Sequence, residues 1–146
     1  MAMTIQLEIL TLAKEYLRED VYCVTAPGSA GRFSVYSGHA AGIFALDPGI
    51  LEVVPPTGSS RFYATGGGFL VVEPGGRRVS VMVRSAETPD EIDERRAREA
   101  LERARRRLNK NGEPYSEDTD LARAELALAR AMARLKIKSH PGHLRH

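Results

Sequence analysis

The second half of the chain holds four residues whose types and spacing suit phosphate binding. Asp93, Arg96, Ala100 and Arg103 recur every three or four residues, so a helix would stack them along one stripe. Arginine guanidinium groups donate paired hydrogen bonds to phosphate oxygens, and the small Ala100 leaves room for a ligand beside the backbone. The alternative is a solvated helix face on which the charges only pair with one another.

Length and composition predict a folded protein of one ordinary domain, with or without an appendage. The chain has 146 residues, of which 42% are hydrophobic and 27% charged, enough to bury a core. Cys23 is the only cysteine, which excludes an internal disulfide framework and argues against a structural zinc site. We expect a reducing compartment. Because no apolar stretch is long enough to cross a bilayer, any membrane role is expected to be peripheral.

The net charge of +2 is unevenly distributed along the chain. Residues 1–86 hold seven Lys or Arg and seven Asp or Glu, residues 87–122 hold eight against eleven, and residues 123–146 hold six against one. The last segment therefore carries +5, which predicts an acidic partner, either a nucleic acid or a carboxylate-rich protein surface. It contains no Phe, Tyr or Trp for base stacking, so single-stranded nucleic acid is the weaker alternative.

The first part of the chain has the pattern of short β-strands. Ile5, Leu7 and Ile9 alternate with polar residues, as in a strand with one buried face. Pairs such as Pro-Gly and Gly-Gly separate the later runs, and residues 74–76 are expected to form a hairpin turn. Many short strands with frequent turns predict a sandwich or barrel. The later strands are expected at 21–26, 32–36, 50–54, 61–65, 69–73 and 79–84.

From Ala86 onward the spacing of apolar residues becomes helical. Thr88, Pro89 and Glu91 form a helix-start signature, with an N-cap, a proline in the first turn and a glutamate that reaches back. The first helix is expected to run to about Leu108. Gly112 and Pro114 break the pattern within 109–117, and a second helix is expected from Asp118 or Thr119 to near Ile137.

The predicted fold class is β + α, with an N-terminal β-sandwich followed by a C-terminal antiparallel two-helix hairpin. The sandwich is placed at residues 1–86, the hairpin at 87–138 and a flexible tail at 139–146. The expected seam of the hairpin is rich in alanine, which buries little apolar area and gives a small docking energy. We hypothesise that the hairpin can open, the alternative being a permanently docked appendage. The seam residues are Ala97, Leu101, Ala104, Leu108, Leu121, Ala124, Leu128, Ala131 and Leu135.

Several short motifs occur in a recognisable order over nearly the whole chain. The β part has Ala-Pro-Gly-Ser-Ala-Gly-Arg-Phe at 26–33, Gly-His-Ala at 38–40, Leu-Asp-Pro-Gly-Ile at 46–50 and Gly-Gly-Phe at 67–69. The helical part has an Ile-Asp, Arg-Ala, Ala, Arg-Ala pattern. This ordered series resembles the epsilon subunit of the F-type rotary ATP synthase, in which that helical pattern binds nucleotide. Its members here are Ile92, Asp93, Arg96, Ala97, Ala100, Arg103 and Ala104.

The resemblance implies a regulatory and structural subunit of a proton-translocating synthase, without a catalytic site. Its sandwich would bind the gamma shaft subunit beside the membrane-embedded c-ring. Its hairpin would either lie on the sandwich or extend along the shaft to the catalytic beta subunits, where it opposes ATP hydrolysis. No cofactor is required, and ATP is a regulatory ligand in some members. The expected location is peripheral, on the cytoplasmic face of a bacterial plasma membrane, the thylakoid stroma being the alternative.

The resemblance also implies roles for particular residues. Contacts with ATP would come from Glu87, Ile92, Asp93, Arg96 and Arg103. Arg123, Arg130 and Arg134 share one face of the second helix and would meet an acidic segment of the catalytic subunits. The loop residues Arg32, Gly38 and His39 would contact partner subunits. No catalytic or metal-binding residue and no nucleic-acid partner is implied.

Three departures from the family pattern affect the sandwich. Ser34 and Ser37 stand where the family usually has Gly and Pro, and the stretch after the first strand lacks its common Pro. Arg32 stands where members often carry a Glu that faces the ring, so the charge at that position is reversed. The remaining alternative function is a free-standing nucleotide-sensing or nucleic-acid-binding β-domain with a basic helical hairpin.

Other chemical candidates have simpler explanations. Cys23 and His39 lack an assignable oxyanion donor or orienting acid, so the sequence does not support a nucleophilic enzyme. Residues 66–68 are three glycines, but no Lys-Ser/Thr follows them and a strand comes next, so they are a bulge or turn rather than a phosphate loop. The tail histidines His140, His143 and His146 are expected in a flexible end rather than a metal site.

Overall fold

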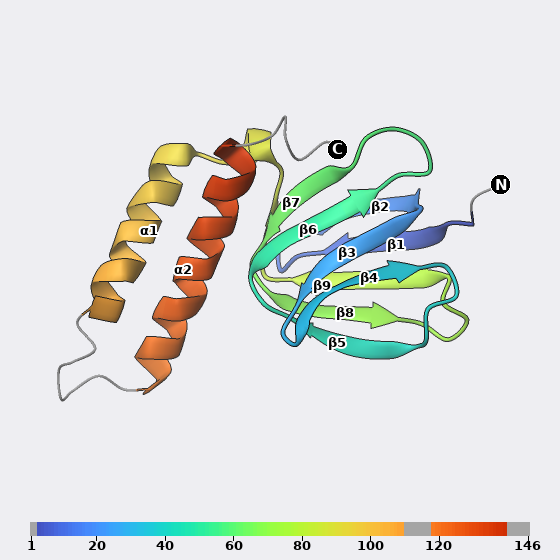
Figure 1. Ribbon diagram of the computed structural model, residues 1–146, viewed down its shortest axis with the longest axis horizontal. Coiled ribbons are helices and arrows are strands. Elements are labelled where there is room, and N and C mark those ends of the chain that lie inside the picture. Colours follow the sequence, from blue (N-terminus) through green and yellow to red (C-terminus); the bar gives the residue numbers. More distant parts are fainter. Residues whose placement is uncertain (1–2, 110–117, 140–146) are drawn as a thin grey trace.

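A computed structural model describes residues 3–109 and 118–139 (Figure 1). Ten strands form the N-terminal part, a single 3-10 turn follows, and two long helices complete the chain. The strands are β1 (Ile5–Leu10), β2 (Glu15–Val21), β3 (Cys23–Gly28), β4 (Gly31–Tyr36), β5 (Gly42–Leu46), β6 (Gly49–Val54), β7 (Arg61–Thr65), β8 (Gly68–Val72), β9 (Arg78–Val83) and β10 (Ala86–Glu87). The helical elements are η1 (Pro89–Glu91), α1 (Glu94–Asn109) and α2 (Asp118–Ser139).

The strands form one hydrogen-bonded sheet that folds over on itself into two layers (Figure 1). Its order is β10-β7-β6-β3-β5-β8-β9-β1-β2, and β4 pairs with β3. The two halves meet where β3 passes to β5 through a single residue pair, Gly28 with Leu46. All neighbouring strands are antiparallel except β1 and β9, which run parallel. The predicted β-sandwich is confirmed.

Large aliphatic side chains fill the space between the two layers. Ile5, Leu7 and Ile9 are fully buried at alternate positions of β1, as the sequence pattern predicts. Leu51 on β6 and Leu70 on β8 are equally buried and face them from other strands. Because each fully buried residue of this size contributes roughly 1.5–3 kcal/mol, the sandwich has a core large enough to be stable.

The chain between the sandwich and α1 differs from the prediction. Thr88 and Glu91 do interact at a helix start, since the Thr88 amide and hydroxyl donate to Glu91 Oε1 at 3.0 Å each. However, this motif caps only the 3-10 turn η1, because the next residue, Ile92, is extended, with φ −86° and ψ 126°. The helix starts afresh at Glu94, with Asp93 Oδ1 accepting from the Arg96 amide at 3.1 Å. The expected single helix is therefore a 3-10 turn, a break and a helix.

The two helices form an antiparallel hairpin beside one end of the sandwich. In Figure 1, α2 lies between α1 and the sandwich, and the contacts of α2 with β6 and β7 agree with this arrangement. Alanines fill the predicted seam, with Ala97, Ala104, Ala124 and Ala131 all at most 2% exposed. The seam leucines are half-buried around them. No helix within the described residues is long and apolar enough to span a membrane.

Candidate functional site at the junction of sandwich and hairpin

A small apolar cluster holds the hairpin against the sandwich. Ile137 and Ala133 of α2 pack with Ala64 of β7, and Ile50 and Phe62 border this group. Ile137 is fully buried, but Ala133 and Ala64 are small. The cluster therefore buries much less apolar surface than the sandwich core, and the docking energy it supplies is correspondingly small.

Polar contacts of α2 with the linker surround this cluster. Arg134 Nε donates to Glu87 Oε1 at 2.5 Å, and both side chains are less than one-third exposed, at 29% and 27%. Lys138 Nζ donates to the Pro89 carbonyl oxygen at 3.0 Å. Glu87, expected from the family resemblance to bind adenine, therefore pairs with an arginine in the docked hairpin. The ion pair joins a residue expected to bind ATP to one expected to bind a catalytic subunit.

Helical geometry brings two predicted stripes to the same side of the hairpin. On α1, Arg96 and Arg103 each come immediately before a seam alanine, Ala97 or Ala104. On α2, Arg123 and Arg130 likewise each come immediately before a buried alanine, Ala124 or Ala131. Because the helices are antiparallel and right-handed, a residue that precedes a seam position lies on the same flank of the pair in both. One flank thus collects the arginines of both stripes.

The predicted ATP-contact residues of the α1 region occupy different environments. Arg96 and Arg103 are exposed and available to a ligand. Asp93 caps α1 and lies 3.8 Å from Arg96, measured from Oδ2 to Nε. Ile92 is only 4% exposed and belongs to the apolar cluster at the junction. Its side chain therefore anchors the start of the hairpin in this arrangement.

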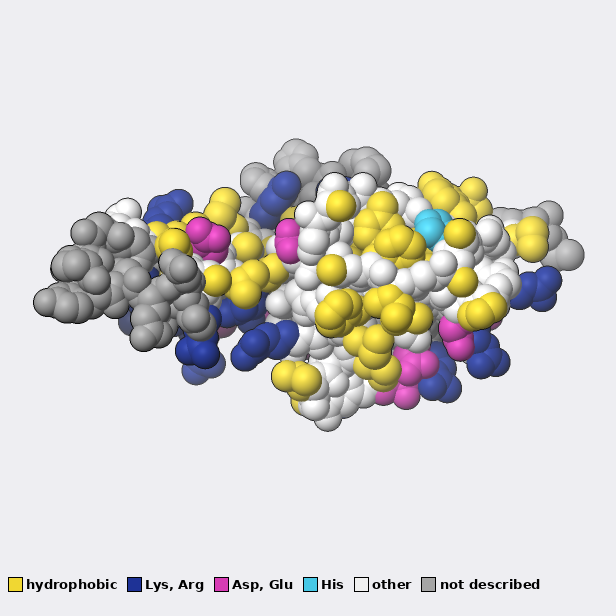
Figure 2. Space-filling model, turned by 90° about the horizontal axis from the view of Figure 1, so that it is seen from below, with side chains coloured by type: hydrophobic (Ala, Val, Ile, Leu, Met, Phe, Trp, Pro, Cys, Tyr) yellow, Lys and Arg dark blue, Asp and Glu magenta, His cyan; other side chains and the backbone are white. Residues whose placement is uncertain are grey.

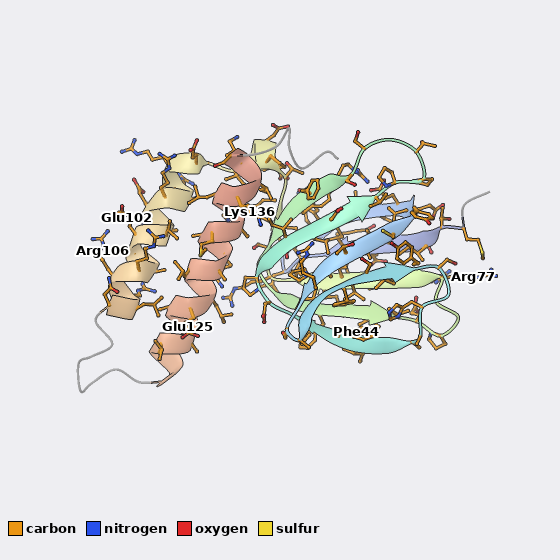
Figure 3. The ribbon with its side chains drawn as sticks, viewed as in Figure 1. Phe44, Arg77, Glu102, Arg106, Glu125 and Lys136 are labelled. Atoms are coloured by element: carbon orange, nitrogen blue, oxygen red, sulfur yellow. The ribbon has the colours of Figure 1, made fainter. Side chains whose placement is uncertain are left out.

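The outer face of α1 matches the alternative of a solvated helix face. Arg98 pairs with Glu94 at 2.7 Å and Arg95 with Glu99 at 3.4 Å, both one turn apart. Figure 3 shows Glu102 and Arg106 on α1 pointing away from α2 and the sandwich. Asp93 and Arg103 line the same open groove as these pairs, so the predicted ATP contacts of α1 border a surface on which charges of both signs alternate.

The three loop residues expected to contact partner subunits lie at two different ends of β4. Arg32 is at its start, where its guanidinium donates to the Ile50 carbonyl oxygen at 2.8 Å. Gly38 and His39 follow its other end, about 17 Å away for a strand of this length. The Gly38 amide donates to the Gly76 carbonyl oxygen at 2.9 Å. Gly76 has φ +68°, and a Cβ there would meet the Gly38 and His39 backbone at 2.6 Å, so this loop requires glycine.

An exposed apolar face on β5, β8 and β9 was not predicted from the sequence. Ile43 is 72% exposed, Phe69 52% and Met82 41%, and Phe69 and Met82 are directly paired across β8 and β9. Figure 2 shows hydrophobic side chains gathered on the face of the sandwich seen from below. An apolar groove lined by Leu12, Phe69, Met82 and Leu126 extends between this face and α2. The sequence signal that could have revealed this face is that β5 and β8 have apolar residues at adjacent as well as alternate positions.

Hydrogen bonds to Glu91 attach the linker to the sandwich just before α1. The Tyr16 hydroxyl of β2 donates to Glu91 Oε1, the same oxygen that accepts from Thr88. Burial and the Glu91 carboxylate raise the pKa of Tyr16. Burial alone would raise the pKa of Glu91, but the hydrogen bonds from Tyr16 and Thr88 outweigh it and hold this pKa below its usual value. The Tyr16 ring also contacts Tyr63 edge to face, at 5.8 Å between centroids.

The candidates for enzyme or metal chemistry are not assembled. Cys23 is buried, and burial raises the pKa of its thiol, which disfavours the reactive thiolate. His39 instead lies edge-on to Phe44, with centroids 5.6 Å apart. Among the side chains of residues 3–109 and 121–139, no three from His, Cys, Asp or Glu are placed to hold a metal ion. The tail histidines His140, His143 and His146 lie outside the described residues.

Comparison with known proteins identifies the family. The profile described as ATP synthase, Delta/Epsilon chain, beta-sandwich domain matches residues 4–89. The profile described as ATP synthase, Delta/Epsilon chain, long alpha-helix domain matches residues 90–139. The chain belongs to the delta/epsilon chain family of the ATP synthase. It is therefore a non-catalytic subunit of the synthase, of the epsilon type found in the central stalk.

Individual relatives support the same assignment over nearly the full length. The ATP synthase epsilon chain of Herpetosiphon aurantiacus is 41% identical over 135 residues, covering 92% of this chain and 94% of the relative. The epsilon chain of Syntrophomonas wolfei is 37% identical over 138 residues, covering 94% and 96%. Both comparisons span the β part and the helical part. Of the two interpretations left by the sequence, they favour the synthase subunit over a free-standing β-domain.

Solved structures show the same arrangement of sandwich and helices. A chain in the cryo-EM structure of the Euglena gracilis mitochondrial ATP synthase, with OSCP, F1 and c-ring in rotational state 1, matches with a TM-score of 0.75 and 28% identity. The match covers 94% of this chain and 82% of that one. A chain in the central stalk and c-ring structure from Tetrahymena thermophila, at 17% identity and a TM-score of 0.61, shares the fold.

Proposed function

We propose that the subunit couples the catalytic head of a proton-translocating ATP synthase to its membrane ring, and that its hairpin inhibits ATP hydrolysis when it leaves the sandwich. The ion pair between Glu87 and Arg134 is the observation that supports this regulation best. In the docked hairpin Arg134 is bound to Glu87 and half-buried against the linker. It therefore becomes available to an acidic partner only when the hairpin undocks, so docking and inhibition exclude each other.

The weakness of the docking contacts supports a reversible arrangement. The hairpin is attached through one fully buried isoleucine, a few alanines and a small number of polar contacts. A switch requires two arrangements of comparable free energy, which such a small interface allows. Once released, the basic stripe Arg123, Arg130 and Arg134 would meet a carboxylate-rich segment of a catalytic beta subunit, where complementary charge favours association.

ATP is proposed as the regulatory ligand that favours docking. The flank that carries Arg96 and Arg103 on α1 also carries Arg130 on α2, and Glu87 lies beside Arg134 near it. A ligand that binds only this assembled flank stabilises the docked hairpin by RT ln(1 + [L]/Kd), or ~2.7 kcal/mol at a hundred times Kd. That is enough to reverse a small preference for the extended form. No other cofactor is proposed.

The exposed apolar face is proposed as the surface that binds the gamma shaft subunit. Ile43, Phe69 and Met82 form a contiguous patch, and such patches on otherwise polar proteins mark interfaces. The loop at Gly38 and His39 and the region of Arg32 are proposed to contact neighbouring subunits, including the c-ring. Because the two epsilon chains named above are bacterial, we place the subunit peripherally on the cytoplasmic face of the plasma membrane, with no role in nucleic-acid binding.

Reconstitution of the synthase tests the inhibitory role. Deleting residues 88–146 removes the hairpin but keeps the sandwich strands, so the complex should assemble and its ATPase activity should rise. The full-length chain in the same reconstitution is the control. Unchanged ATPase activity in a correctly assembled complex would refute inhibition by the hairpin.

Calorimetry on the isolated chain tests the nucleotide site. Arg103→Ala removes a guanidinium from the proposed flank and should weaken ATP binding about tenfold or more, because a charged hydrogen bond is worth roughly 1.5–3 kcal/mol. Arg105→Ala is the matched control, since Arg105 is exposed and follows the seam residue Ala104, which places it on the other flank of the same helix. Equal affinity of the two variants would remove ATP from the α1 flank.

A further inference from the structure

One arginine of the sandwich lies against the basic stripe of α2. Arg84 directly follows β9 and comes three residues before Glu87. It lines the same groove as Leu126 of α2, and Arg130 is one helical turn beyond Leu126. Arg134, one turn farther, is bonded to Glu87. The segments that carry Arg84 and Glu87 therefore meet two successive turns of α2 here.

The charges at this meeting point do not compensate one another. Arg130 is half-buried, and burial together with the guanidinium groups of Arg84 and Arg134 lowers its pKa. Within residues 3–109 and 121–139, no carboxylate forms an ion pair with Arg84 or Arg130, whereas Glu87 pairs with Arg134. Three positive charges thus face one negative charge; Arg84 is exposed, whereas the partial burial of Arg130 and Arg134 reduces screening by salt.

Docking itself creates this excess of positive charge. Arg130 and Arg134 belong to the hairpin, whereas Arg84 belongs to the sandwich and stays behind when the hairpin leaves. Like charges brought together in a partly desolvated site raise the free energy of the docked state. An anion with several oxygens placed between them would reverse the sign of the interaction, because each guanidinium would then bind phosphate.

We propose that Arg84 is the sandwich's part of a polyphosphate-binding site shared with α2, and that it makes docking of the hairpin depend on the bound anion. The proposal rests on the proposed function, since the anion is the phosphate chain of the nucleotide that favours docking. To that proposed function it adds Arg84, a residue outside the helices, and a second effect of this residue on docking. Arg84 opposes docking when the site is empty and strengthens docking when the site is filled.

Hydrogen exchange on the full-length chain tests both effects of Arg84. The readout is the exchange rate of α2 amides, with and without ATP or tripolyphosphate, in magnesium-free buffer at constant ionic strength. Arg84→Gln is compared with Arg77→Gln, which removes the same charge at the end of the sandwich far from the hairpin (Figure 3). Without anion, Arg84→Gln should slow α2 exchange by about two- to fivefold, as expected for one partly screened charge interaction. When the anion is present, Arg84→Gln should require an anion concentration about fivefold higher or more to give α2 the same protection.

The outcomes separate this proposal from the nucleotide site itself. Opposite shifts in Arg84→Gln, with Arg77→Gln like the unmodified chain, support the proposal. Identical behaviour of the two variants, or faster exchange in Arg84→Gln without anion, overturns it. If tripolyphosphate protects α2 and ATP does no better, the site for polyphosphate stands and the assignment to nucleotide fails. If neither anion protects α2 in the unmodified chain, both proposals fail.

Discussion

The sandwich and the hairpin are held together by different kinds of side chain. In the sandwich, fully buried Ile, Leu and Val side chains from both layers interdigitate. In the described part of the hairpin, the buried seam positions are four alanines, and contact with the sandwich adds Ala133 and Ile137. Helical propensity of Ala, Arg, Glu and Leu can maintain the helices, but it does not fix where they lie. This difference indicates that the sandwich is a rigid body that binds partners, whereas the hairpin, called the arm below, can change its position separately.

Substitution in the sandwich core should have the largest effect on global stability. Leu51→Ala leaves a cavity between the layers and should lower the free energy of unfolding by about 2–5 kcal/mol. Urea denaturation followed by circular dichroism measures this change. Leu126→Ala, at a position 45% exposed on α2, is the control and should change stability by less than about 1 kcal/mol. Similar losses in the two variants would contradict the division into a firm core and a weakly packed arm.

Substitution in the junction cluster should release the arm without unfolding the sandwich. Ile137→Ala removes the largest apolar contact of α2 with β6 and β7 and should cost about 2–4 kcal/mol of docking free energy. Hydrogen exchange should then speed up in α2 while β1, β6 and β8 stay protected. Met132→Ala, 53% exposed on the same helix, should leave both unchanged. Equal acceleration in the strands would show that the chain unfolds as one cooperative unit.

The sequence predicts most of the fold because its periodicities are strong where burial is one-sided. β1 and β9 alternate clearly, and the alanine seam follows helical spacing. The sequence pattern missed β2, β5 and β10. β2 (Glu15–Val21) carries charges at an edge of the sheet. β5 (Gly42–Leu46) is apolar on both faces, since the neighbouring residues Ile43, which is exposed, and Phe44, which is half-buried, point to opposite sides. Alternation carries no signal in either case.

The candidate site was predictable in composition but not in geometry. Spacing within one helix groups Arg96 with Arg103, and the family resemblance adds Glu87. The pairing of Glu87 with Arg134, the break at Ile92 and the position of Arg84 all depend on how α2 packs against β6 and β7. Such contacts join residues about 50 positions apart, as with Arg134 and Glu87 at a separation of 47. Local patterns do not encode them.

The smallest effect is expected at the hydrogen bond between Tyr16 and Glu91, at the boundary between the sandwich and the hairpin. The pKa of Glu91 is lowered in the folded chain, so the carboxylate contributes stability above its unfolded pKa, and this contribution is lost as pH falls through the folded pKa. Glu91→Gln should therefore lower stability at pH 7 by less than about 1 kcal/mol, since the group is exposed, and the difference should shrink in acid below about pH 4.

Urea midpoints of Glu91→Gln and the unmodified chain between pH 3 and 7 measure this dependence. Glu102→Gln is the control, because Glu102 lies on the outer flank of α1 away from the linker (Figure 3). Tyr16→Phe removes the donor on β2 and should reproduce part of the Glu91→Gln effect at pH 7, because both substitutions break the same hydrogen bond. A pH-independent difference would mean that Glu91 acts through packing rather than through its charge, and the linker would then be attached to the sandwich by apolar contacts alone.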